Sequence, residues 1–397
     1  MDPAEIRSAH FVDAYFPVVD GVAQTVHHYA KQMNRLAGSC VVAPEPLSRD
    51  YDDSGLGYDV FRTAAVRVPI AEYTLPAPRF DPRLRGWLSK KKPAVIHFHS
   101  PFFEGSFAAS YAKKRGVPSV ATFHSKYYDD AINVTGSKTV AKLVTAKVVR
   151  CFQSADSVWA VSHGAADTLR SYGFKGNIDV IENGTSFEPP KDPDALRVRA
   201  AAAFSIPRDK KILLFVGHLI WHKNLKLVLD TFRMLCDRCG DYRLLIVGDG
   251  YDENEIKSYA RSLCFPDEAV RFLGKILDRE LLAGVYLNAD LFFFPSVYDT
   301  SGLVIREAAA MGTPSLLVEG SDAAEAVQQN VSGFLTAESA DAMCREILRV
   351  FRTEGLLKKV GAQAQISIPK PWKTMVAAAM EKYAEIIERY RFEHQND

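Results

Sequence analysis

Short runs of apolar residues recur along the chain and alternate with longer segments in which apolar positions follow a helical period. The short runs predict strands at residues 8–12, 40–43, 95–99, 119–123, 157–161, 179–181, 211–216, 243–247, 270–273, 290–294 and 314–317. The longer segments predict helices at residues 24–36, 104–115, 139–153, 224–236, 252–263 and 340–351. Most of the predicted strands are apolar throughout, as parallel strands covered by helices on both faces are. The pattern therefore predicts an α/β fold with doubly wound parallel sheets.

The series of strands and helices is interrupted once, at the proline-rich and charged residues 188–193. A new buried-strand pattern begins at Lys211, so we expect two Rossmann-like domains, residues 1–190 and 191–371. Residues 372–397 are expected to form a helix that packs back on the first domain. Two such domains facing each other across a cleft would gather the carboxyl ends of their strands there, where open parallel sheets bind ligands.

Composition and charge argue against several classes of function. Of 397 residues, 49 are Lys or Arg and 48 are Asp or Glu, so the net charge is +1 and no nucleic-acid partner is expected. The N-terminus shows no signal-peptide pattern, and no apolar run approaches a membrane span. Six scattered cysteines are typical of free thiols in a reducing compartment. We expect a cytoplasmic protein, soluble or peripherally bound to the inner face of the cell membrane.

The segment 296–307 follows a predicted strand and opens a helix. Thr300 and Ser301 are expected to cap that helix, and Gly302 lets the backbone approach a ligand closely. The first N–H groups of a helix favour an anion such as a phosphate. Asp299 and Glu307 flank this anion site, and carboxylates accept hydrogen bonds from sugar and ribose hydroxyls. A capped helix with a solvated glutamate is the alternative interpretation.

Three further loops follow predicted strands in the second half. Lys223, in the loop after residue 216, is expected to open a helix and to neutralise a diphosphate, although alone it would be an ordinary surface lysine. The loop Val247-Gly248-Asp249-Gly250 is a weak nucleotide signal because it lacks the full dinucleotide fingerprint. In the loop 272–276, an open backbone edge could pair with a base.

In their order and spacing these four loops resemble the C-terminal domain of retaining glycosyltransferases of the GT-B fold, in the large family called glycosyl transferases group 1 (family four). The resemblance covers nearly the whole chain and implies a nucleotide-sugar donor, with UDP-glucose expected from the family. Lys223 would bind its diphosphate, and Glu307 its ribose. By the same resemblance the donor-binding residues are Gly21, His218, Lys223, Gly248, Lys275, Ile276, Asp299, Ser301, Gly302, Leu303 and Glu307.

Two positions depart from the family pattern. His218 stands where the family has Arg, and Asp299 stands where it has the first Glu of its paired glutamates. A histidine is only partly charged near neutrality, and an aspartate is one methylene shorter than a glutamate. Either change is expected to slow turnover or to alter the donor sugar. A catalytically impaired protein that still binds the nucleotide sugar is therefore one alternative.

The N-terminal half carries histidines at two predicted strand ends, in Ile-His-Phe-His-Ser-Pro (96–101) and Thr-Phe-His-Ser-Lys-Tyr (122–127). By resemblance His124 lies beside the sugar and is catalytic together with Asp299 and Lys223. The two strings look most like the branch that glycosylates diacylglycerol and similar membrane lipids. That likeness implies that the acceptor is bound by His99, Lys126 and Tyr127.

The family resemblance also implies the mechanism. No carboxylate is obviously placed as a nucleophile behind the sugar, as a two-step retaining hydrolase would need. The acceptor hydroxyl would attack from the front, with retention, and the leaving phosphate would take its proton. No metal or other cofactor is expected, since helix N–H groups and Lys223 would stabilise the diphosphate. The metal-like string Asp50-Tyr51-Asp52-Asp53 lies in a polar loop away from these motifs and is interpreted as solvated surface.

A basic and apolar helix at residues 139–153 bears on the acceptor. It carries Lys142, Lys147 and Arg150 together with Leu143 and Val144. Such a surface could rest on anionic lipid, although a solvated charged face is the alternative. A further alternative is a non-hydrolysing sugar-nucleotide epimerase, which shares the two-lobed plan and would act on the nucleotide sugar alone.

Overall fold

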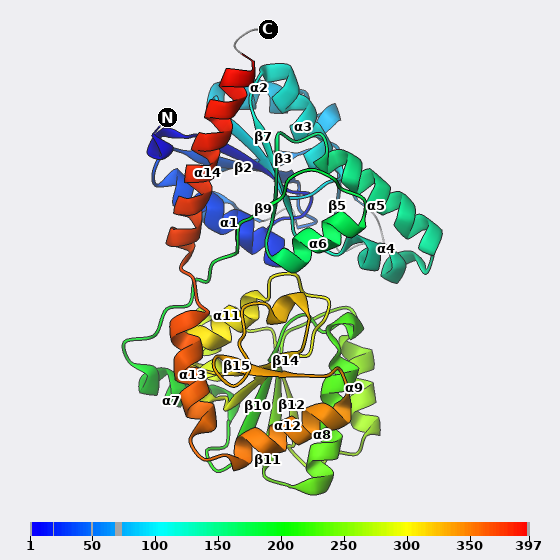
Figure 1. Ribbon diagram of the computed structural model, residues 1–397, viewed down its shortest axis with the longest axis vertical. Helices are drawn as coiled ribbons and strands as arrows, with labels where there is room; N and C mark the ends of the chain where they lie inside the picture. Colours follow the sequence, from blue (N-terminus) through cyan, green and yellow to red (C-terminus); the bar gives the residue numbers. More distant parts are fainter. Residues whose placement is uncertain (1, 19, 49–50, 68–73, 395–397) are drawn as a thin grey trace. The chain divides into compact units, whose positions relative to one another are not determined.

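The computed structural model describes residues 2–18, 20–48, 51–67 and 74–394 (Figure 1). It divides into two compact units: the first comprises Met1–Gly184 together with Trp372–Asp397, and the second comprises Thr185–Pro371. This division falls six residues before the expected boundary at 190, so the proline-rich residues 188–193 lie in the second unit.

A parallel sheet of seven strands, in the order β3-β2-β1-β6-β7-β8-β9, forms the centre of the first unit as far as it is described. The strands are β1 (Ser8–Phe11), β2 (Ser39–Pro44), β3 (Asp59–Thr63), β6 (Val95–Phe98), β7 (Ser119–Phe123), β8 (Ser157–Ala160) and β9 (Asp179–Val180). An antiparallel pair, β4 (Ala65–Arg67) and β5 (Thr74–Pro76), lies next to β2. The helices are α1 (Gly21–Asn34), α2 (Pro82–Lys91), α3 (Phe103–Arg115), α4 (Tyr127–Thr135), α5 (Lys138–Phe152), α6 (His163–Ser171) and α14 (Trp372–Glu393), with 3-10 turns η1 (Pro3–Glu5), η2 (Ser54–Leu56) and η3 (Pro78–Phe80).

The second unit is built around a parallel sheet of six strands in the order β12-β11-β10-β13-β14-β15. The strands are β10 (Lys211–Val216), β11 (Tyr242–Val247), β12 (Val270–Gly274), β13 (Leu291–Phe293), β14 (Ser315–Val318) and β15 (Gly333–Thr336). The helices are α7 (Pro193–Phe204), α8 (Leu225–Arg238), α9 (Glu253–Ser262), α10 (Arg279–Asn288), α11 (Leu303–Ala310), α12 (Ala340–Arg352) and α13 (Leu356–Ser367), with 3-10 turns η4 (Trp221–Lys223) and η5 (Asp322–Ala324).

Burial explains why the central strands were predictable. Strands β1, β2, β6, β7 and β8 are buried at every position, and β10 is buried at all but its first residue. Since helices cover both faces, each position favours an apolar side chain. In each unit the strand order reverses once, between β1 and β6 and between β10 and β13. Such a reversal leaves a crevice at the carboxyl ends of the strands, which is where ligands of this architecture bind.

The C-terminal helix α14 completes the first unit (red in Figure 1). It lies against α1, where the rings of Trp372 and His28 stack with their centroids 4.8 Å apart. Tyr383 is fully buried, and its hydroxyl lies 2.5 Å from Nδ1 of His97 on β6. The helix therefore supplies part of the core of the first unit.

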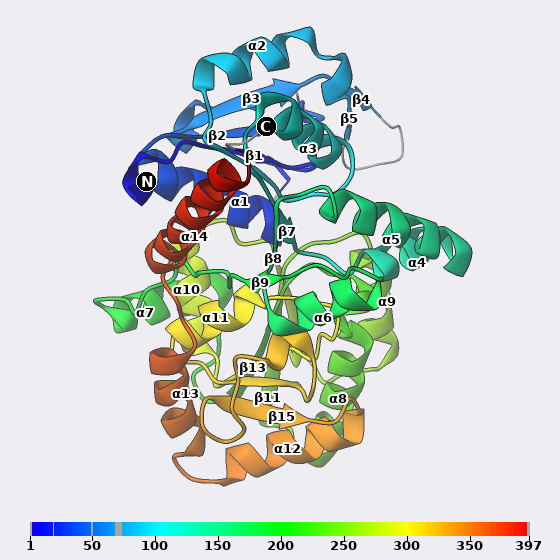
Figure 2. The same cartoon turned by 45° about the horizontal axis from the view of Figure 1, so that its top comes forward.

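Helices α4 and α5 pack side by side at one edge of the first unit, as Figure 2 shows. Among the described residues, no helix combines the length and the apolar character that a membrane span requires. All six cysteines are free.

Candidate active site

The loops that follow β10 and β13 meet at the strand-order reversal of the second unit. Lys223 lies in the first of these loops, with 9% of its surface exposed, and its Nζ donates to Oδ1 of Asp299 at 2.6 Å in the second loop. The other carboxylate oxygen of Asp299 accepts from Oγ of Ser296 at 2.5 Å. The ammonium group also lies 5.4 Å from the centre of the Phe294 ring. A buried lysine needs such partners, and these hold its charge at the carboxyl edge of the sheet.

The sequence predicted that Lys223 opens a helix, and this prediction was wrong. Lys223 ends the 3-10 turn η4, and Asn224 follows in a left-handed conformation with φ of 57°. The Asn224 side chain, instead of capping α8, donates to the carbonyl of Pro295 at 2.9 Å and to Glu338 at 2.6 Å. The bond to Pro295 fastens the lysine loop to the loop that carries Asp299, and the bond to Glu338 fastens it to the loop after β15.

Glycines bring the loops after β10 and β11 into backbone contact. A Cβ on Gly248 would lie 1.9 Å from the carbonyl oxygen of Gly217, and the φ of Gly248 is +137°. A Cβ on Gly250 would lie 2.5 Å from the carbonyl oxygen of Leu219. The Gly-Asp-Gly string is therefore required for close packing of two loops at this edge.

The helix α11 begins beside Asp299, but its cap differs from the expectation. Gly302 is the N-cap residue, with φ of 54°, and no side chain caps this end, so Thr300 and Ser301 do not have the role predicted for them. Leu303 is the first helical residue, and the helix runs for eight residues. The first N–H groups of a helix lack carbonyl partners within it, which leaves the positive end of α11 available to an anion.

Glu307 lies one turn inside α11 and is held at both carboxylate oxygens. Arg279 donates to Oε1 at 3.0 Å, and the Tyr286 hydroxyl donates to Oε2 at 3.1 Å. Burial raises the pKa of Glu307, and the bonds from Arg279 and Tyr286 act against that rise. Both partners come from α10, which approaches α7 closely because Gly284 has no side chain. The carboxylate is thus fixed in orientation while its side chain stays 14% exposed.

The remaining predicted donor-binding residues of the second unit lie in the loops after β10 and β12. His218 is exposed, next to Gly217 in the lysine loop. The Lys275 ammonium lies 3.2 Å from Oδ2 of Asp249, so the loops after β11 and β12 share an ion pair. Ile276 is half-buried and packs against the apolar core. Each of these residues follows a strand, as predicted.

In the first unit, Gly21 is the first residue of α1 and is exposed. The preceding Asp20 caps this helix by accepting from the Ala23 N–H at 2.7 Å. Helix α1 is thus the first helix after β1, and its N-terminal end is capped by a carboxylate.

The histidines of the first unit form a buried group. His99 Nδ1 lies 3.0 Å from His124 Nε2, and His99 Nε2 lies 3.1 Å from His10 Nδ1. His99 is 1% exposed and His124 is 7% exposed. Burial lowers the pKa of His10 and His124 to about 3, and that of His97 and His99 well below the ordinary value. All four are therefore neutral at physiological pH.

Two predicted acceptor contacts lie next to this group. Lys126 is half-buried and directly precedes α4. Tyr127 is 8% exposed, with its ring centroid 5.5 Å from those of both Phe102 and Phe123. The Tyr127 ring is thus a member of the apolar core. In the metal-like string, Asp50 lies outside the described residues, and Asp53 receives two hydrogen bonds from Arg62.

Three residues of these clusters carried no signal in the sequence. Tyr286 has a common residue type at a position without a motif, and Arg279 looks like an ordinary charge at a helix start. His10 lies inside an apolar strand, and only the parallel register that sets it beside His97 shows its neighbours. A sequence gives such contacts only once strand pairing is known.

Two family models match the chain: Glycosyltransferase Family 4 at residues 19–188 and Glycosyl transferases group 1 at residues 198–366. A GDP-mannose-dependent alpha-mannosyltransferase of Corynebacterium glutamicum is 26% identical over 96% of this chain and 89% of its own length. An alpha-monoglucosyldiacylglycerol synthase of Streptococcus pneumoniae is also 26% identical, over 78% of this chain and 70% of its own. A sucrose-phosphate synthase structure from Thermosynechococcus elongatus superposes with a TM-score of 0.80 at 19% identity, covering 97% of this chain and 100% of that one.

Proposed function

The chain belongs to the GT-B glycosyltransferases whose two halves are described as Glycosyltransferase Family 4 and Glycosyl transferases group 1, and we propose that it moves a hexose from a nucleoside diphosphate sugar to a membrane-lipid hydroxyl with retention. Use of a nucleotide-sugar donor follows from the family. The choice of sugar, base, acceptor and stereochemistry is the proposal. The expected donor is UDP-glucose, and GDP-mannose is the donor printed in the name of one relative.

The observation that carries the donor half is the ion pair of Lys223 and Asp299 beside the start of α11. An ammonium group and unpaired helix N–H groups together suit a diphosphate. Glu307, oriented by Arg279 and Tyr286, presents a carboxylate that can accept from ribose hydroxyls. Asp299 would hold the sugar hydroxyls when the diphosphate shares the charge of Lys223.

The proposed reaction breaks the bond between the sugar carbon and the diphosphate oxygen and forms a bond from that carbon to the acceptor oxygen on the same face. The acceptor proton passes to the departing phosphate oxygen. Positive charge grows on the sugar while negative charge grows on the diphosphate. Lys223 and the start of α11 would stabilise the leaving group, without a metal ion, and His124 would orient the sugar. Activity is accordingly expected to persist in excess EDTA.

The donor assignment can be tested by thermal shift with UDP, GDP, ADP and their sugars. One nucleoside diphosphate should raise the melting temperature by several degrees, since ligand at 100 times Kd adds about 2.7 kcal/mol. Glu307→Gln should weaken that binding at least tenfold because one ribose acceptor is lost. Glu354→Gln, an exposed change between α12 and α13, is the matched control and should bind normally. A panel in which no nucleotide shifts the melting temperature would refute the donor site.

The acceptor half rests on the surface that we call the α4–α5 tip: Val134, Lys138, Val140, Lys142 and Leu143. Val134 is 86% exposed and Leu143 is 67% exposed, and both lysines are exposed beside them. Apolar side chains flanked by lysines bind anionic membrane surfaces by partial insertion and charge attraction. The same surface would bring the enzyme to a lipid acceptor.

We predict that the protein sediments with vesicles containing diacylglycerol and an anionic phospholipid, and glycosylates the diacylglycerol. Leu143→Glu should reduce both vesicle binding and lipid glycosylation severalfold, because a charge replaces an inserting side chain. Val198→Glu, at a 53% exposed valine on α7 of the second unit, is the control and should alter neither. Equal activity on a soluble disaccharide, with no vesicle binding, would contradict the lipid acceptor.

A further inference from the structure

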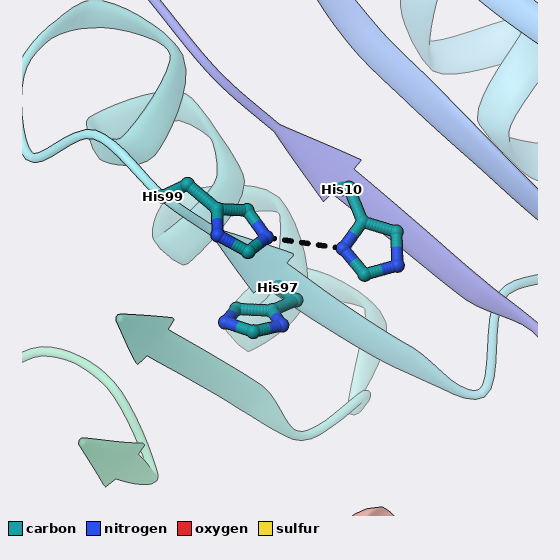
Figure 3. Close-up of side chains that lie close together, drawn as sticks. All are labelled: His10, His97 and His99. Carbon is teal, nitrogen blue, oxygen red and sulfur yellow. Dashed lines mark hydrogen bonds between the residues drawn. The ribbon is translucent and has the colours of Figure 1, made fainter. Parts of the chain in front are cut away.

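A linear series of hydrogen-bonded side chains crosses the sheet of the first unit, and we call it the file. Ser39 Oγ lies 2.8 Å from Ser8 Oγ, which lies 3.0 Å from His10 Nε2. His10 Nδ1 lies 3.1 Å from His99 Nε2, and His99 Nδ1 lies 3.0 Å from His124 Nε2 (Figure 3 shows the central link). These residues belong to β2 and β1 or directly follow β6 and β7, four neighbouring strands. The file thus ends at the histidine assigned to the sugar.

The file has a defined chemistry because its imidazoles are neutral. A neutral imidazole carries one N–H donor and one acceptor nitrogen. Each hydrogen bond in the file therefore needs a donor on one side and an acceptor on the other. Once one ring donates in one direction along the file, the next ring must carry its proton on the nitrogen that donates in the same direction. His10 and His99 use both ring nitrogens within the file, so neither can reverse alone without breaking a bond.

Two senses of the file are possible. If every group donates toward His124, the proton of His124 is on Nδ1, and that atom is a donor. If every group donates away from it, the proton is on Nε2, and Nδ1 becomes an acceptor. Every ring is neutral in both senses, so neither sense places a charge in the buried sheet. A change of sense moves one proton across each link, while Nδ1 of His124 releases a proton and the serine end takes one up. The rotating hydroxyls of Ser8 and Ser39 accommodate either sense at the far end.

His10, His97 and His99 also have nitrogens close enough together to suggest a metal ion, but the contacts argue against one. The nitrogens of His97 are bonded to Tyr383 and Thr122. Its ring lies 4.0 Å from that of His99, tilted by 30°, so the two rings face one another rather than aim at a common point (Figure 3). The bonded partners of His10 and His97 are hydroxyls and an imidazole, which do not offset a buried double charge.

We propose that His10 and His99 are positioning residues whose imidazole file decides which ring nitrogen of His124 carries its proton. The file thereby decides whether His124 meets the sugar as a hydrogen-bond donor or acceptor. The role in catalysis rests on the proposed function, whereas the coupling of the three rings does not.

The coupling can be measured without substrate, by nitrogen NMR of the full chain labelled with 15N-histidine. Wild-type protein should show His10, His99 and His124 in tautomers of the same sense. His10→Phe should change the tautomer populations of His99 and His124. The control is His97→Phe, a change of the same residue type at an equally buried position outside the file, which should leave His124 unaltered. Ser8→Ala removes the hydroxyl partner of His10 and serves if His10→Phe does not fold.

The catalytic consequence is measured as transfer from the nucleotide sugar. His10→Phe should lower kcat about tenfold, by analogy with the loss of a partner that orients a metal-binding histidine. KM for the donor should stay within about twofold, since His10 would not touch the donor. His97→Phe should destabilise the fold yet keep kcat, so a loss of kcat confined to His10→Phe separates positioning from general damage.

Several outcomes would overturn the proposal. Identical His124 signals in wild type and His10→Phe, or opposite senses at His10 and His124, would remove the coupling. An unchanged kcat in His10→Phe despite an altered His124 tautomer would remove its catalytic role. One Zn²⁺ bound per chain, and lost in both His10→Phe and His97→Phe, would show a metal centre instead. If the chain turns over no nucleotide sugar, the proposed function fails, while the NMR result still decides the coupling.

Discussion

At the scale of single residues, the first unit buries titratable groups of two opposing kinds. His10, His97, His99 and His124 are held neutral by burial. Nearby in the same unit, burial raises the pKa of Asp13 to about 6 and that of Glu104 to about 8, although backbone N–H groups at the start of α3 and the Thr63 hydroxyl act against it. The histidines and the carboxyls therefore oppose each other in the pH dependence of stability.

We predict that the free energy of unfolding is largest near pH 7 and falls in acid. Below the ordinary histidine pKa of 6.5, the unfolded chain binds protons at the four sites and the folded chain does not, so stability is lost as the pH drops. Asp13 and Glu104 offset part of this, because the folded chain keeps their protons where the unfolded chain releases them. These four histidines against these two carboxyls contribute a slope of about 3 kcal/mol per pH unit near pH 5.5.

Denaturant titrations between pH 5 and pH 8 would measure that slope. His97→Phe removes one histidine from the count and should reduce the acid slope by about 1.4 kcal/mol per pH unit. A free energy of unfolding that does not change between pH 7 and pH 5 would show that the histidines take up protons in the folded state.

Residue types at strand ends could be predicted from the sequence, but their partners could not. Lys223, Asp299 and Glu307 were singled out because each lies in or after a loop that follows an apolar run. Arg279 lies in the site because α10 packs beside α11. No periodic pattern in the sequence marks such a contact between two helices. The predicted cap by Thr300 or Ser301 was wrong because Gly302, in a left-handed conformation, begins the helix instead.

At the scale of elements, buried central strands were predicted nearly to the residue. Of the edge strands, β9 and β12 were predicted, whereas β3 and β15 were missed. Strand β3 is only partly buried and alternates poorly, so it gave no apolar run. Strand β15 and the pair β4 and β5 are short edge segments of the same kind. Helix α10 was missed for the opposite reason: Leu282–Leu287 are buried in succession, so no single apolar face marks a helix.

The packing of the loops after β10 and β11 yields a prediction for Gly248. Gly248→Ala should destabilise the protein by roughly 2 to 4 kcal/mol, because the new methyl group would overlap the Gly217 carbonyl and the positive φ is strained for alanine. It should also weaken nucleotide binding, since the lysine loop would move.

Gly240→Ala is the matched control, because a Cβ there meets no atom within 4 Å and the backbone has no positive φ. Denaturant unfolding should place it within about 0.5 kcal/mol of wild type. Similar unfolding free energies for both variants would mean that the loop after β11 can move away at little cost.

At the scale of the whole molecule, the second unit is one continuous stretch and the first is not. Helix α14 contributes buried side chains to the first unit: Trp372, Val376, Ala379, Met380, Tyr383, Ile386 and Ile387. A fragment Thr185–Pro371 is therefore expected to fold alone and melt cooperatively. A fragment Met1–Gly184 should lack a cooperative transition, because an apolar face and the Tyr383 bond to His97 are missing.

Circular dichroism melts of the two fragments would test this prediction. Joining residues 372–397 to the end of Met1–Gly184 through a flexible linker should restore the transition. Cooperative melting of the unextended fragment at the wild-type temperature would show that α14 adds little to the core.

The return of the chain to its first unit also separates the order of synthesis from the order of folding. The chain passes from one unit to the other after Gly184 and again after Pro371, and these two points are adjacent. Gly184 packs against Trp372, and the Thr185 N–H donates to the Lys370 carbonyl at 2.8 Å. A ribosome must finish the second unit before it makes α14, the helix that completes the first unit. The unit whose synthesis begins first is thus completed last, because its core lacks the apolar side chains of α14 until residues 372–393 have been made.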